Sequence, residues 1–457
     1  MRAVIRRGGA LVVDDMAVPN PESGQVLCRT LVCGICGSDL HALDHYDHMI
    51  DMSARLSGGG AMKKGADTVF GHEFCCEVIE NGPDTGGRFK PGAKVVSIPG
   101  IITQAGFEAV GYSSRIPGGF AENIILSEAL MLEVPNGLSA EHAALTEPLA
   151  VGEHAVAKAE PTADHVCMVV GCGPVGLAVI AALRARGLGP IIACDYSAER
   201  RAAAERMGAD KIIDPAEVSP HDSWAEFNVP ASNAMGLMAA AQGLTVKKPL
   251  IFECVGAPGV VQALALAAPG GTRILVAGVC MEVDQIEPFT FIAKEIELRF
   301  VLGYTPAEFA ESLRNLAEGK TRYNEIITGV VSLDETPAAF TALQTDKSQI
   351  KIMVAPGPVE GSDRRSEDDP GEQEQKRRHG LARAKAGPLG EEDGEHHRHH
   401  RQGVGSDHGE EHGRAAGAGA PRAMNGAEPR RIGVRRQAVG AQRREAMATV
   451  QRPPLRR

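Results

Sequence analysis

The sequence predicts an α/β protein in which a β-rich domain is followed by a parallel, doubly wound sheet. Three observations support this prediction. Short apolar runs separated by Gly and Pro fill residues 1–150, which is typical of a β-rich domain with a partly closed barrel. Strand-like and helix-like segments alternate over residues 151–292, as in a parallel sheet with crossover helices. The composition then changes abruptly near Pro356.

The strands expected in residues 1–150 are short apolar runs bounded by Gly, Pro or charged residues. They are Gln25–Val32, Phe74–Glu80, Lys94–Pro99, Glu122–Leu126 and Met131–Val134. Residues 293–356 are expected to return the chain to this domain. In that segment we expect helices at Ala307–Ala317 and Pro337–Thr345 and a closing strand at Ile350–Val354.

In residues 151–292 strand-like apolar runs alternate with helix-like segments, which predicts a parallel, doubly wound sheet. The expected strands are Cys167–Val170, Ile191–Asp195, Leu250–Cys254 and Arg273–Ala277. The expected helices are Val175–Arg186, Ala198–Met207 and Val260–Ala267.

Residues 357–457 form a compositionally biased tail of Gly, Arg, Glu, His, Ala and Pro, without an aromatic residue or a cysteine. Such a segment cannot bury enough apolar surface to offset its chain entropy, so we expect it to be disordered. This composition is also typical of a GC-rich gene translated in the wrong frame. We therefore hypothesise a frameshift or read-through extension, which the gene sequence and the intact mass of the native protein would test.

The overall composition excludes several classes of protein. The chain has 457 residues, a formal net charge of −10 and ten cysteines. The mild acidity gives no reason to expect nucleic acid as a partner. The N-terminus lacks the apolar run of a signal peptide, and no apolar stretch is long enough to span a bilayer. We expect a cytoplasmic protein without membrane contact, whose cysteines are reduced.

A glycine motif opens the second region. It is Val169-Val170-Gly171-Cys172-Gly173-Pro174-Val175-Gly176. Gly171 permits a tight turn, Gly173 lets the backbone approach a pyrophosphate, and Gly176 lets the next helix pack on the sheet. The pyrophosphate would lie at the helix N-terminus, near Pro174 and Val175, where the helix dipole favours an anion. With a strand before it and an Ala-rich helix after it, the motif predicts a dinucleotide site.

Asp195, at the end of the next strand, indicates which dinucleotide binds. A carboxylate there accepts hydrogen bonds from the adenosine ribose hydroxyls and repels a 2′-phosphate, so NAD is favoured over NADP. Arg200 and Arg201 follow closely in the sequence. Their cations could bind a 2′-phosphate, so NADP remains an alternative cofactor.

Three potential metal ligands lie upstream of the glycine motif or just before it. Their segments are Gly34-Ile35-Cys36-Gly37-Ser38-Asp39-Leu40-His41, Gly71-His72-Glu73-Phe74 and Thr146-Glu147-Pro148-Leu149. Each residue alone is more often a core or solvated residue. Together, Cys36, His72 and Glu147 supply a thiolate, an imidazole and a carboxylate, a set that leaves a fourth position open on Zn²⁺.

These motifs resemble the zinc-dependent medium-chain alcohol dehydrogenase superfamily, in its sorbitol, threonine and butanediol dehydrogenase branch. Gly118-Gly119-Phe120-Ala121-Glu122 and Phe252-Glu253-Cys254-Val255-Gly256 match it as well. The resemblance covers about residues 1–356. It implies a GroES-like catalytic domain over 1–150, a Rossmann NAD-binding domain over 151–292, and one catalytic zinc and NAD as cofactors.

The resemblance also implies roles for single residues at the zinc. Cys36 and His72 would be zinc ligands. Glu147 stands at the third ligand position, where many relatives carry Cys and the sorbitol type carries a Glu that binds directly or through water. Glu73 would enter the zinc shell during ligand exchange, and Asp39 would fix the tautomer of His72.

The same resemblance implies a proton path and further cofactor contacts. Zinc is a Lewis acid that lowers the pKa of an alcohol hydroxyl. Ser38 would take the proton and pass it through the cofactor ribose to His41, which exchanges it with solvent. Val255, Gly256 and Gly278 would line the cofactor site.

Three stretches bear on how this chain differs from its relatives. Val96–Phe120 contains no cysteine, so the four-cysteine structural zinc of many relatives is not expected. Gly303 stands where sorbitol dehydrogenases carry an Arg that helps to bind polyol hydroxyls, which weakens a polyol assignment. The Gly- and Met-rich segment His45–Thr68 is expected to be a loop that shapes the substrate pocket, although a plain solvated loop explains it nearly as well.

The leading interpretation is an NAD-dependent zinc alcohol dehydrogenase that oxidises a secondary or bulky primary alcohol to a ketone or aldehyde. A polyol or amino-alcohol dehydrogenase is the alternative among enzymes. A dinucleotide-binding protein without catalysis is the alternative of another class, and the intact set of candidate residues disfavours it. We expect a small-molecule alcohol or carbonyl substrate and a homodimer or homotetramer.

Overall fold

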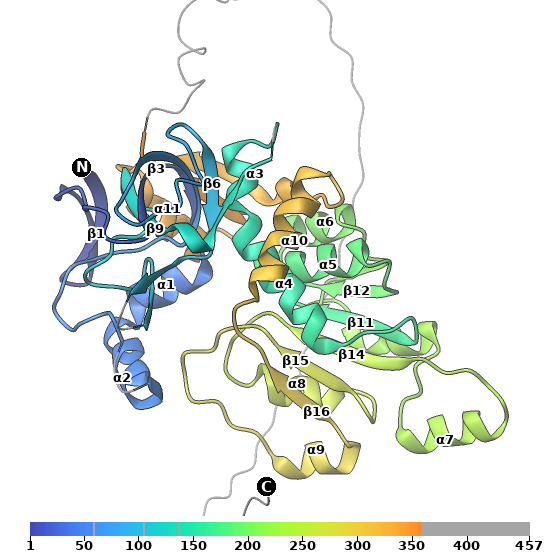
Figure 1. The fold of residues 1–457 in the computed structure, drawn as a ribbon. Helices are drawn as coiled ribbons and strands as arrows, with labels where there is room; N and C mark the ends of the chain where they lie inside the picture. The colour runs from blue at the N-terminus through green and yellow to red at the C-terminus, as the bar shows by residue number, and fades with distance from the viewer. Residues whose placement is uncertain (58–59, 104–105, 136, 358–457) are drawn as a thin grey trace, which may run out of the picture. The chain divides into compact units, whose positions relative to one another are not determined.

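The computed structural model describes residues 1–57, 60–103, 106–135 and 137–357 (Figure 1). The predictions for the tail, its disorder and its reading frame, concern residues outside this described part, apart from Gly357. Among the helices of the described residues, none combines the length and the apolar character needed to cross a membrane.

Six parallel strands form the sheet predicted for the second region. They are β11 (His165–Val170), β12 (Ile191–Cys194), β13 (Lys211–Ile213), β14 (Lys248–Glu253), β15 (Arg273–Val276) and β16 (Glu297–Phe300). Their order in the sheet is β13-β12-β11-β14-β15-β16. The chain moves outward from β11 to β13, returns to β14, and moves outward to β16. This is the doubly wound topology, and its switch point lies between β11 and β14.

Helices cover both faces of this sheet (Figure 1). The elements are α5 (Pro174–Ala185), α6 (Ala198–Arg206), the 3-10 helix η2 (Pro220–Phe227), α7 (Asn233–Ala241), α8 (Val260–Ala267) and α9 (Pro288–Lys294). Successive side chains of β11 point to opposite faces. Cys167 and Val169 therefore pack in the cluster of α5 and α6, while Val166 and Met168 pack in the cluster of α8.

Two elements cross the limits predicted for the regions. Helix α4 (Thr146–Ala159) runs through residue 150 without a break. Strand β16 lies beyond residue 292, yet it pairs with β15, and Leu298 packs against the core of the six-stranded sheet. The sheet thus continues to Phe300 before the chain returns to the β-rich part.

The β-rich part is built around β3 (Gln25–Gly34), which pairs with β5 (Glu73–Asn81), β9 (Asn123–Ser127) and β18 (Lys351–Val354). Its other strands are β1 (Arg2–Arg7), β2 (Ala10–Asp15), β4 (Thr68–Val69), β6 (Lys94–Ser97), β7 (Gly100–Thr103), β8 (Gly106–Ala109), β10 (Met131–Glu133) and β17 (Ile327–Val331). Its helical elements are α1 (Gly37–Asp44), α2 (Tyr46–Ser57), α3 (Ala140–Ala144), α11 (Thr336–Thr345) and the 3-10 helices η1 (Glu128–Leu130) and η3 (Tyr323–Ile326). As predicted, β18 returns from the end of the described chain, and it lies between β3 and β17.

The prediction of a loop over His45–Thr68 is wrong for its first half, because Tyr46–Ser57 forms α2. Tyr46, Met49 and Ile50 recur at the spacing of a helix and pack against the core of the β-rich part. The Tyr46 hydroxyl also shares a hydrogen bond of 2.6 Å with the Thr68 hydroxyl. These contacts fix the helix despite the glycines that follow it.

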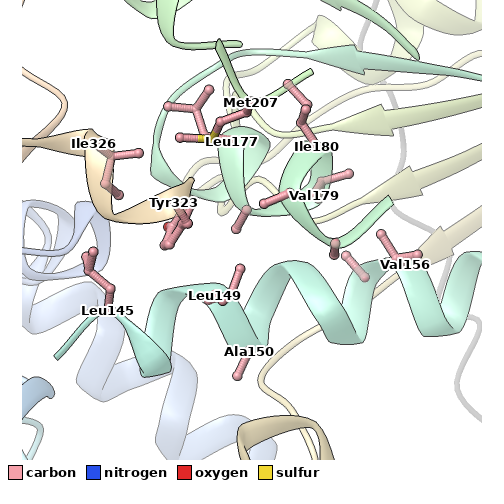
Figure 2. Packing of buried hydrophobic residues seen from close by; sticks show 14 of the residues in the cluster. Leu145, Leu149, Ala150, Val156, Leu177, Val179, Ile180, Met207, Tyr323 and Ile326 are labelled. Carbon is pink, nitrogen blue, oxygen red and sulfur yellow. The ribbon is translucent and has the colours of Figure 1, made fainter. Parts of the chain in front are cut away.

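A shared core joins the β-rich part to the six-stranded sheet (Figure 2). Leu149 and Val156 of α4 pack with Leu177 and Ile180 of α5. The helices approach closely at Gly152, where a Cβ would lie 2.4 Å from the backbone carbon of Ala178. Helix α4 begins at the predicted zinc region, and α5 begins at the glycine motif. The packing of the two helices therefore fixes the position of one region relative to the other.

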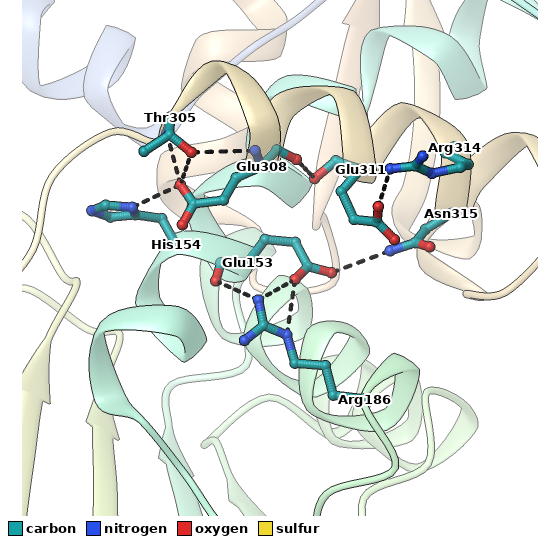
Figure 3. A network of polar contacts seen from close by, with 9 residues as sticks. Glu153, His154, Arg186, Thr305, Glu308, Glu311, Arg314 and Asn315 are labelled. Atoms are coloured by element: carbon teal, nitrogen blue, oxygen red, sulfur yellow. Dashed lines mark hydrogen bonds and ion pairs between the residues drawn. The ribbon is translucent and has the colours of Figure 1, made fainter.

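Helix α10 (Pro306–Ala317) is tied to α4 by two polar contacts (Figure 3). Nδ1 of His154 lies 2.9 Å from a carboxylate oxygen of Glu308. The buried carboxylate of Glu153 accepts hydrogen bonds from Arg186, which directly follows α5, and from Asn315 of α10. These contacts satisfy the buried carboxylate and fix the position of α4.

Candidate active site

The glycine turn has the geometry that its sequence predicts. Gly171 has a φ of 88°, which favours glycine. At Gly176 a Cβ would lie 1.9 Å from the Gly171 carbonyl oxygen, so only glycine allows this approach of helix and turn. At Gly173 a Cβ would meet only Arg200, at 3.9 Å, so the space beside this backbone is open. The turn leads directly into α5, which begins at Pro174 and Val175.

Asp195 lies directly after β12, beside the glycine turn. One carboxylate oxygen accepts a hydrogen bond of 2.8 Å from the Cys172 N–H, and the other accepts one of 2.8 Å from the Ser197 N–H. Arg200 reaches the same region and donates to the Gln349 carbonyl at 3.2 Å, while its buried Nε has no hydrogen-bond partner. Both predicted ribose- and phosphate-binding residues therefore lie at the glycine turn.

Two further turns continue this surface along the carboxyl edge of the sheet. A Cβ at Gly171 would lie 2.8 Å from the Val255 side chain. Gly256 has a φ of 69°, and a Cβ there would lie 2.6 Å from the backbone of Val279. A Cβ at Gly278 would lie 2.3 Å from the Gly256 nitrogen. The predicted cofactor residues thus form one continuous backbone surface.

Cys36, His72 and Glu73 form a compact group of metal-binding atoms. Their sulfur, nitrogen and oxygen atoms all lie within 4.8 Å of one another. Cys36 is the N-cap of α1, and the other two residues lie at the start of β5. His72 and Glu73 are buried, and Cys36 is partly exposed. Thiolate, imidazole and carboxylate are the ligands that Zn²⁺ binds in proteins, so the donor set fits this metal.

Two carboxylates therefore compete for the role of third ligand, and each has a partner that the sequence did not reveal. Both oxygens of Glu73 accept hydrogen bonds from the fully buried Lys351, at 2.7 and 2.6 Å. Glu147 instead accepts a hydrogen bond of 2.9 Å from the Tyr304 hydroxyl. The predicted ligand Glu147 is thus outside the compact group, and Glu73 is inside it.

Burial raises the pKa of Glu147 to about 7, and the negative charge of Glu73 adds to this effect. Attraction to His72 and the hydrogen bond from Tyr304 act in the opposite direction. Burial lowers the pKa of Lys351, but the combined effect of attraction to Glu73, Cys36 and Glu147 and of the hydrogen bond to Glu73 outweighs it, so the pKa is raised. The two glutamates consequently differ in charge environment, although they lie in one site.

Asp39 and Ser38 lie beside the two ring nitrogens of His72. Asp39 is fully buried and lies 3.3 Å from Nδ1 of His72, and it accepts a hydrogen bond from the Cys36 N–H at 3.0 Å. The Ser38 hydroxyl lies 3.4 Å from Nε2 of His72. Tyr112, which no sequence signal identified, donates a hydrogen bond of 2.7 Å to the Ser38 hydroxyl.

His41 lies on α1 three residues after Ser38, so both side chains project from similar faces of the helix. It is half-buried, and its ring centre lies 6.4 Å from that of His45. Burial lowers the pKa of His41, the charge of His45 adds to this shift, and Asp44 opposes it. His41 is therefore neutral over more of the acidic range than an ordinary histidine.

Comparison with known proteins identifies the family. A model of the alcohol dehydrogenase GroES-like domain matches residues 22–136, and a model of the zinc-binding dehydrogenases matches residues 174–318. The (R,R)-butanediol dehydrogenase of Bacillus subtilis (strain 168) is 32% identical over 354 residues, which are 75% of this chain and 96% of that protein. The chain belongs to the zinc-dependent medium-chain alcohol dehydrogenase superfamily.

Other relatives place this dehydrogenase in the sorbitol and butanediol branch. Sorbitol dehydrogenase of Bacillus subtilis (strain 168) is 29% identical over 369 residues, covering 78% of this chain and 96% of that protein. The solved structure of 2R,3R-butanediol dehydrogenase from Bacillus subtilis superimposes with a TM-score of 0.63, at 29% identity, over 78% of this chain and 99% of that one. A zinc-binding dehydrogenase from Sinorhizobium meliloti 1021 bound to NADP gives 0.63 at 25% identity, over 78% and 99%.

The family, the fold and the donor set together define the activity class. The chain is an NAD-dependent, zinc-dependent alcohol oxidoreductase with a GroES-like domain and a Rossmann-type nucleotide domain. The predicted fold class and the predicted cofactors, zinc and NAD, are thereby confirmed.

Proposed function

We propose that this dehydrogenase oxidises a secondary alcohol to a ketone with NAD, with small vicinal diols as the first candidate substrates. The observation that carries the proposal is the compact group of Cys36, His72 and Glu73, beside the Ser38 hydroxyl. The butanediol and sorbitol dehydrogenases similar to this chain are named for substrates that contain secondary hydroxyls. When bound, zinc supplies a Lewis acid that lowers the pKa of the alcohol hydroxyl, and NAD accepts the hydride.

Cys36 and His72 hold the zinc in this proposal, and Asp39 orients His72. Glu147 is the third ligand, directly or through a water, and Glu73 exchanges with it. The paired geometry supports this exchange, because Lys351 neutralises Glu73 when it is not a ligand. A buried carboxylate without such a partner would be costly.

Ser38 accepts the proton of the substrate hydroxyl, and His41 delivers it to solvent. The hydrogen bond of 2.7 Å from Tyr112 supports the first role, because it orients the Ser38 hydroxyl and occupies only one of its two lone pairs, so the second can accept a proton. The half-buried position of His41 on the same helix supports the second role. The path between them includes the cofactor ribose.

The cofactor lies along the glycine turn. The N–H groups of Gly173, Val175 and Gly176 face its pyrophosphate, beside Arg200, and Asp195 accepts hydrogen bonds from the adenosine ribose. Val255, Gly256 and Gly278 line the remainder of the cofactor site. The open space at Gly173 supports this arrangement.

A polyol or amino-alcohol substrate is the second candidate. The similarity to sorbitol dehydrogenase favours it, whereas Gly303 stands against it, because this position offers no side chain to bind polyol hydroxyls. A dinucleotide-binding protein without catalysis would not need the compact group with its thiolate, so we give this alternative the least weight.

The test is NADH formation by the purified zinc-loaded protein with a panel of alcohols. The panel contains butane-2,3-diol isomers, sorbitol, threonine, a simple secondary alcohol and a bulky primary alcohol. We expect turnover with butane-2,3-diol or the simple secondary alcohol to exceed that with sorbitol and threonine. Highest turnover with sorbitol or threonine would select the second candidate, and no turnover despite NADH binding would favour the protein without catalysis.

We further propose that the protein is a cytoplasmic homodimer or homotetramer that assembles through the edge strand β16. Phe300 is 71% and Leu302 is 87% exposed at this edge. The edge of a sheet presents unpaired backbone N–H and C=O groups, which can pair with a strand of another chain. Light scattering should give a dimer or tetramer that Phe300→Lys disrupts, whereas Leu237→Lys on α7, also at an exposed apolar residue, should not. A monomeric wild type, or equal effects of both variants, would contradict the proposal.

A further inference from the structure

Glu253 is a buried carboxylate that the reaction described above does not use. It ends β14, and its residue is 1% exposed. One of its carboxylate oxygens accepts hydrogen bonds from two consecutive backbone N–H groups, those of Val255 at 2.7 Å and Gly256 at 2.8 Å. Charge-assisted hydrogen bonds of this kind hold a turn more firmly than neutral ones.

The same residue also holds the neighbouring turn after β15. Its backbone carbonyl accepts hydrogen bonds from the N–H groups of Ala277 at 2.9 Å and Gly278 at 3.0 Å. A Cβ at Gly278 would lie only 2.8 Å from the second carboxylate oxygen of Glu253. Glu253 therefore lies where the two turns touch, and it contacts both.

The order of strands in the sheet indicates which half of the dinucleotide lies against the turns after β14 and β15. Asp195 follows β12, on one side of β11 and its glycine turn, while Glu253 ends β14 on the other side. An extended dinucleotide with its pyrophosphate at the glycine turn spans the switch point. With the adenosine on the β12 side, the nicotinamide half must extend over the ends of β14 and β15.

We propose that Glu253 is a positioning residue for the nicotinamide end of the cofactor: it binds the turns at Val255–Gly256 and Gly278 so that their backbones form the surface on which the nicotinamide ring lies. This inference rests on the proposed cofactor site at the glycine turn. Glu253 acts through these turns and does not touch the reacting atoms.

Binding of two ligands distinguishes this positioning role from a role of Glu253 in folding alone. NADH carries both halves of the cofactor, whereas ADP-ribose lacks only the nicotinamide ring. Affinity for each is measured by titration of the zinc-loaded protein, as wild type and as Glu253→Ala, Glu253→Asp and Glu253→Gln. Glu205→Gln, on the exposed side of α6, is the matched control. If wild type binds neither ligand, the proposed cofactor site itself is wrong.

Glu253→Ala should weaken NADH binding about tenfold or more, because two backbone N–H groups lose their charged acceptor and the turn that they hold loosens. ADP-ribose affinity should change much less, because the glycine turn and Asp195 remain. The shorter Asp should show an intermediate loss, and Gln, whose carbonyl oxygen accepts the same two hydrogen bonds, should restore most of the affinity. The control should bind both ligands as wild type does.

Unchanged NADH affinity in Glu253→Ala would overturn the proposal. Equal losses of NADH and ADP-ribose affinity in the Ala and Asp variants would also overturn it and assign Glu253 a role in folding alone. If the Ala variant does not fold, the Asp variant decides between these outcomes by the same two titrations.

Discussion

The two carboxylates near the zinc site differ because their neighbours differ. Glu73 faces the cation of Lys351, whereas Glu147 faces the neutral hydroxyl of Tyr304. Burial disfavours a charged carboxylate, and a nearby cation offsets this cost. Glu147 consequently has its pKa raised to about 7, and binding of a divalent cation would return it to the charged form.

His41 gives the first prediction at the scale of single residues. Its lowered pKa means that it stays neutral, and able to accept a proton, down to a pH below its ordinary value of 6.5. Alcohol oxidation by the wild type should fall as the pH drops through this lowered pKa. In His41→Ala the rate should be lower and should lose this dependence, and added imidazole should restore part of it.

The matched control is His45→Ala, which removes the neighbouring ring and leaves His41 in place. It should raise the pKa seen in the pH–rate profile, because the charge of His45 lowers the pKa of His41. An unchanged profile in His41→Ala would exclude this residue from the proton path.

Asp195 gives the second prediction. Asp195→Ala should shift the kcat/KM preference from NAD toward NADP by about tenfold or more, since it removes a charged ribose acceptor and the repulsion of a 2′-phosphate. Asp195→Asn separates the two effects, because it keeps one acceptor oxygen and removes the charge. A wild type that already prefers NADP would show that Asp195 does not select the cofactor.

At the scale of elements, β18 connects the end of the described chain to the zinc site. It pairs with β3 and β17, and its first residue, Lys351, donates to the Ile35 carbonyl at 2.9 Å as well as to Glu73. The sequence predicted this strand from its apolar residues. The buried cation at its start could not be predicted, because its partner Glu73 is distant in sequence.

Lys351→Met should lower the free energy of unfolding of the metal-free protein by about 3–5 kcal/mol, because it leaves Glu73 as an unpaired buried charge. Urea unfolding measures this difference. The double variant Lys351→Met with Glu73→Gln should recover most of the loss, and Lys347→Met at an exposed lysine should cost little. A Lys351→Met variant as stable as wild type would show that the pair contributes nothing.

Elements marked by a motif or by an apolar run were predictable from the sequence, and elements defined by distant contacts were not. Helix α5 and strand β12 follow from the glycine motif and the apolar runs, and the structure matches them within one residue at each end. Helix α2 was missed because its apolar residues are few and its neighbours are glycines. Tyr112 and Tyr304 act through hydrogen bonds to residues far away in the sequence, so no local pattern marks them.

At the scale of the whole molecule, the packing of α4 against α5 fixes the position of the zinc residues relative to the glycine turn (Figure 2). Glu147 lies in the first turn of α4, and the glycine turn leads into α5. Composition and motifs predicted both regions, and their mutual arrangement depends on this interface, where Gly152 permits the close approach.

Truncated proteins test which C-terminal segments the fold requires. Removal of residues 358–457 should leave zinc content, thermal stability and turnover unchanged, because the composition of this segment offers little apolar surface. A stop after Gln349 should instead prevent folding, since it removes β18 from between β3 and β17. Loss of activity in the protein that ends at Gly357 would show that the tail contributes to the fold.

The most direct test of the central claim, zinc-dependent alcohol oxidation at Cys36 and His72, is the zinc content per chain measured together with NADH binding. Wild type and the control Cys280→Ala should hold about one zinc per chain. Cys36→Ala and His72→Ala should hold almost none and lose turnover, while NADH still binds, because its site lies on the other sheet. Full zinc and turnover in either variant, or a wild type with about two zinc ions per chain, would contradict the account.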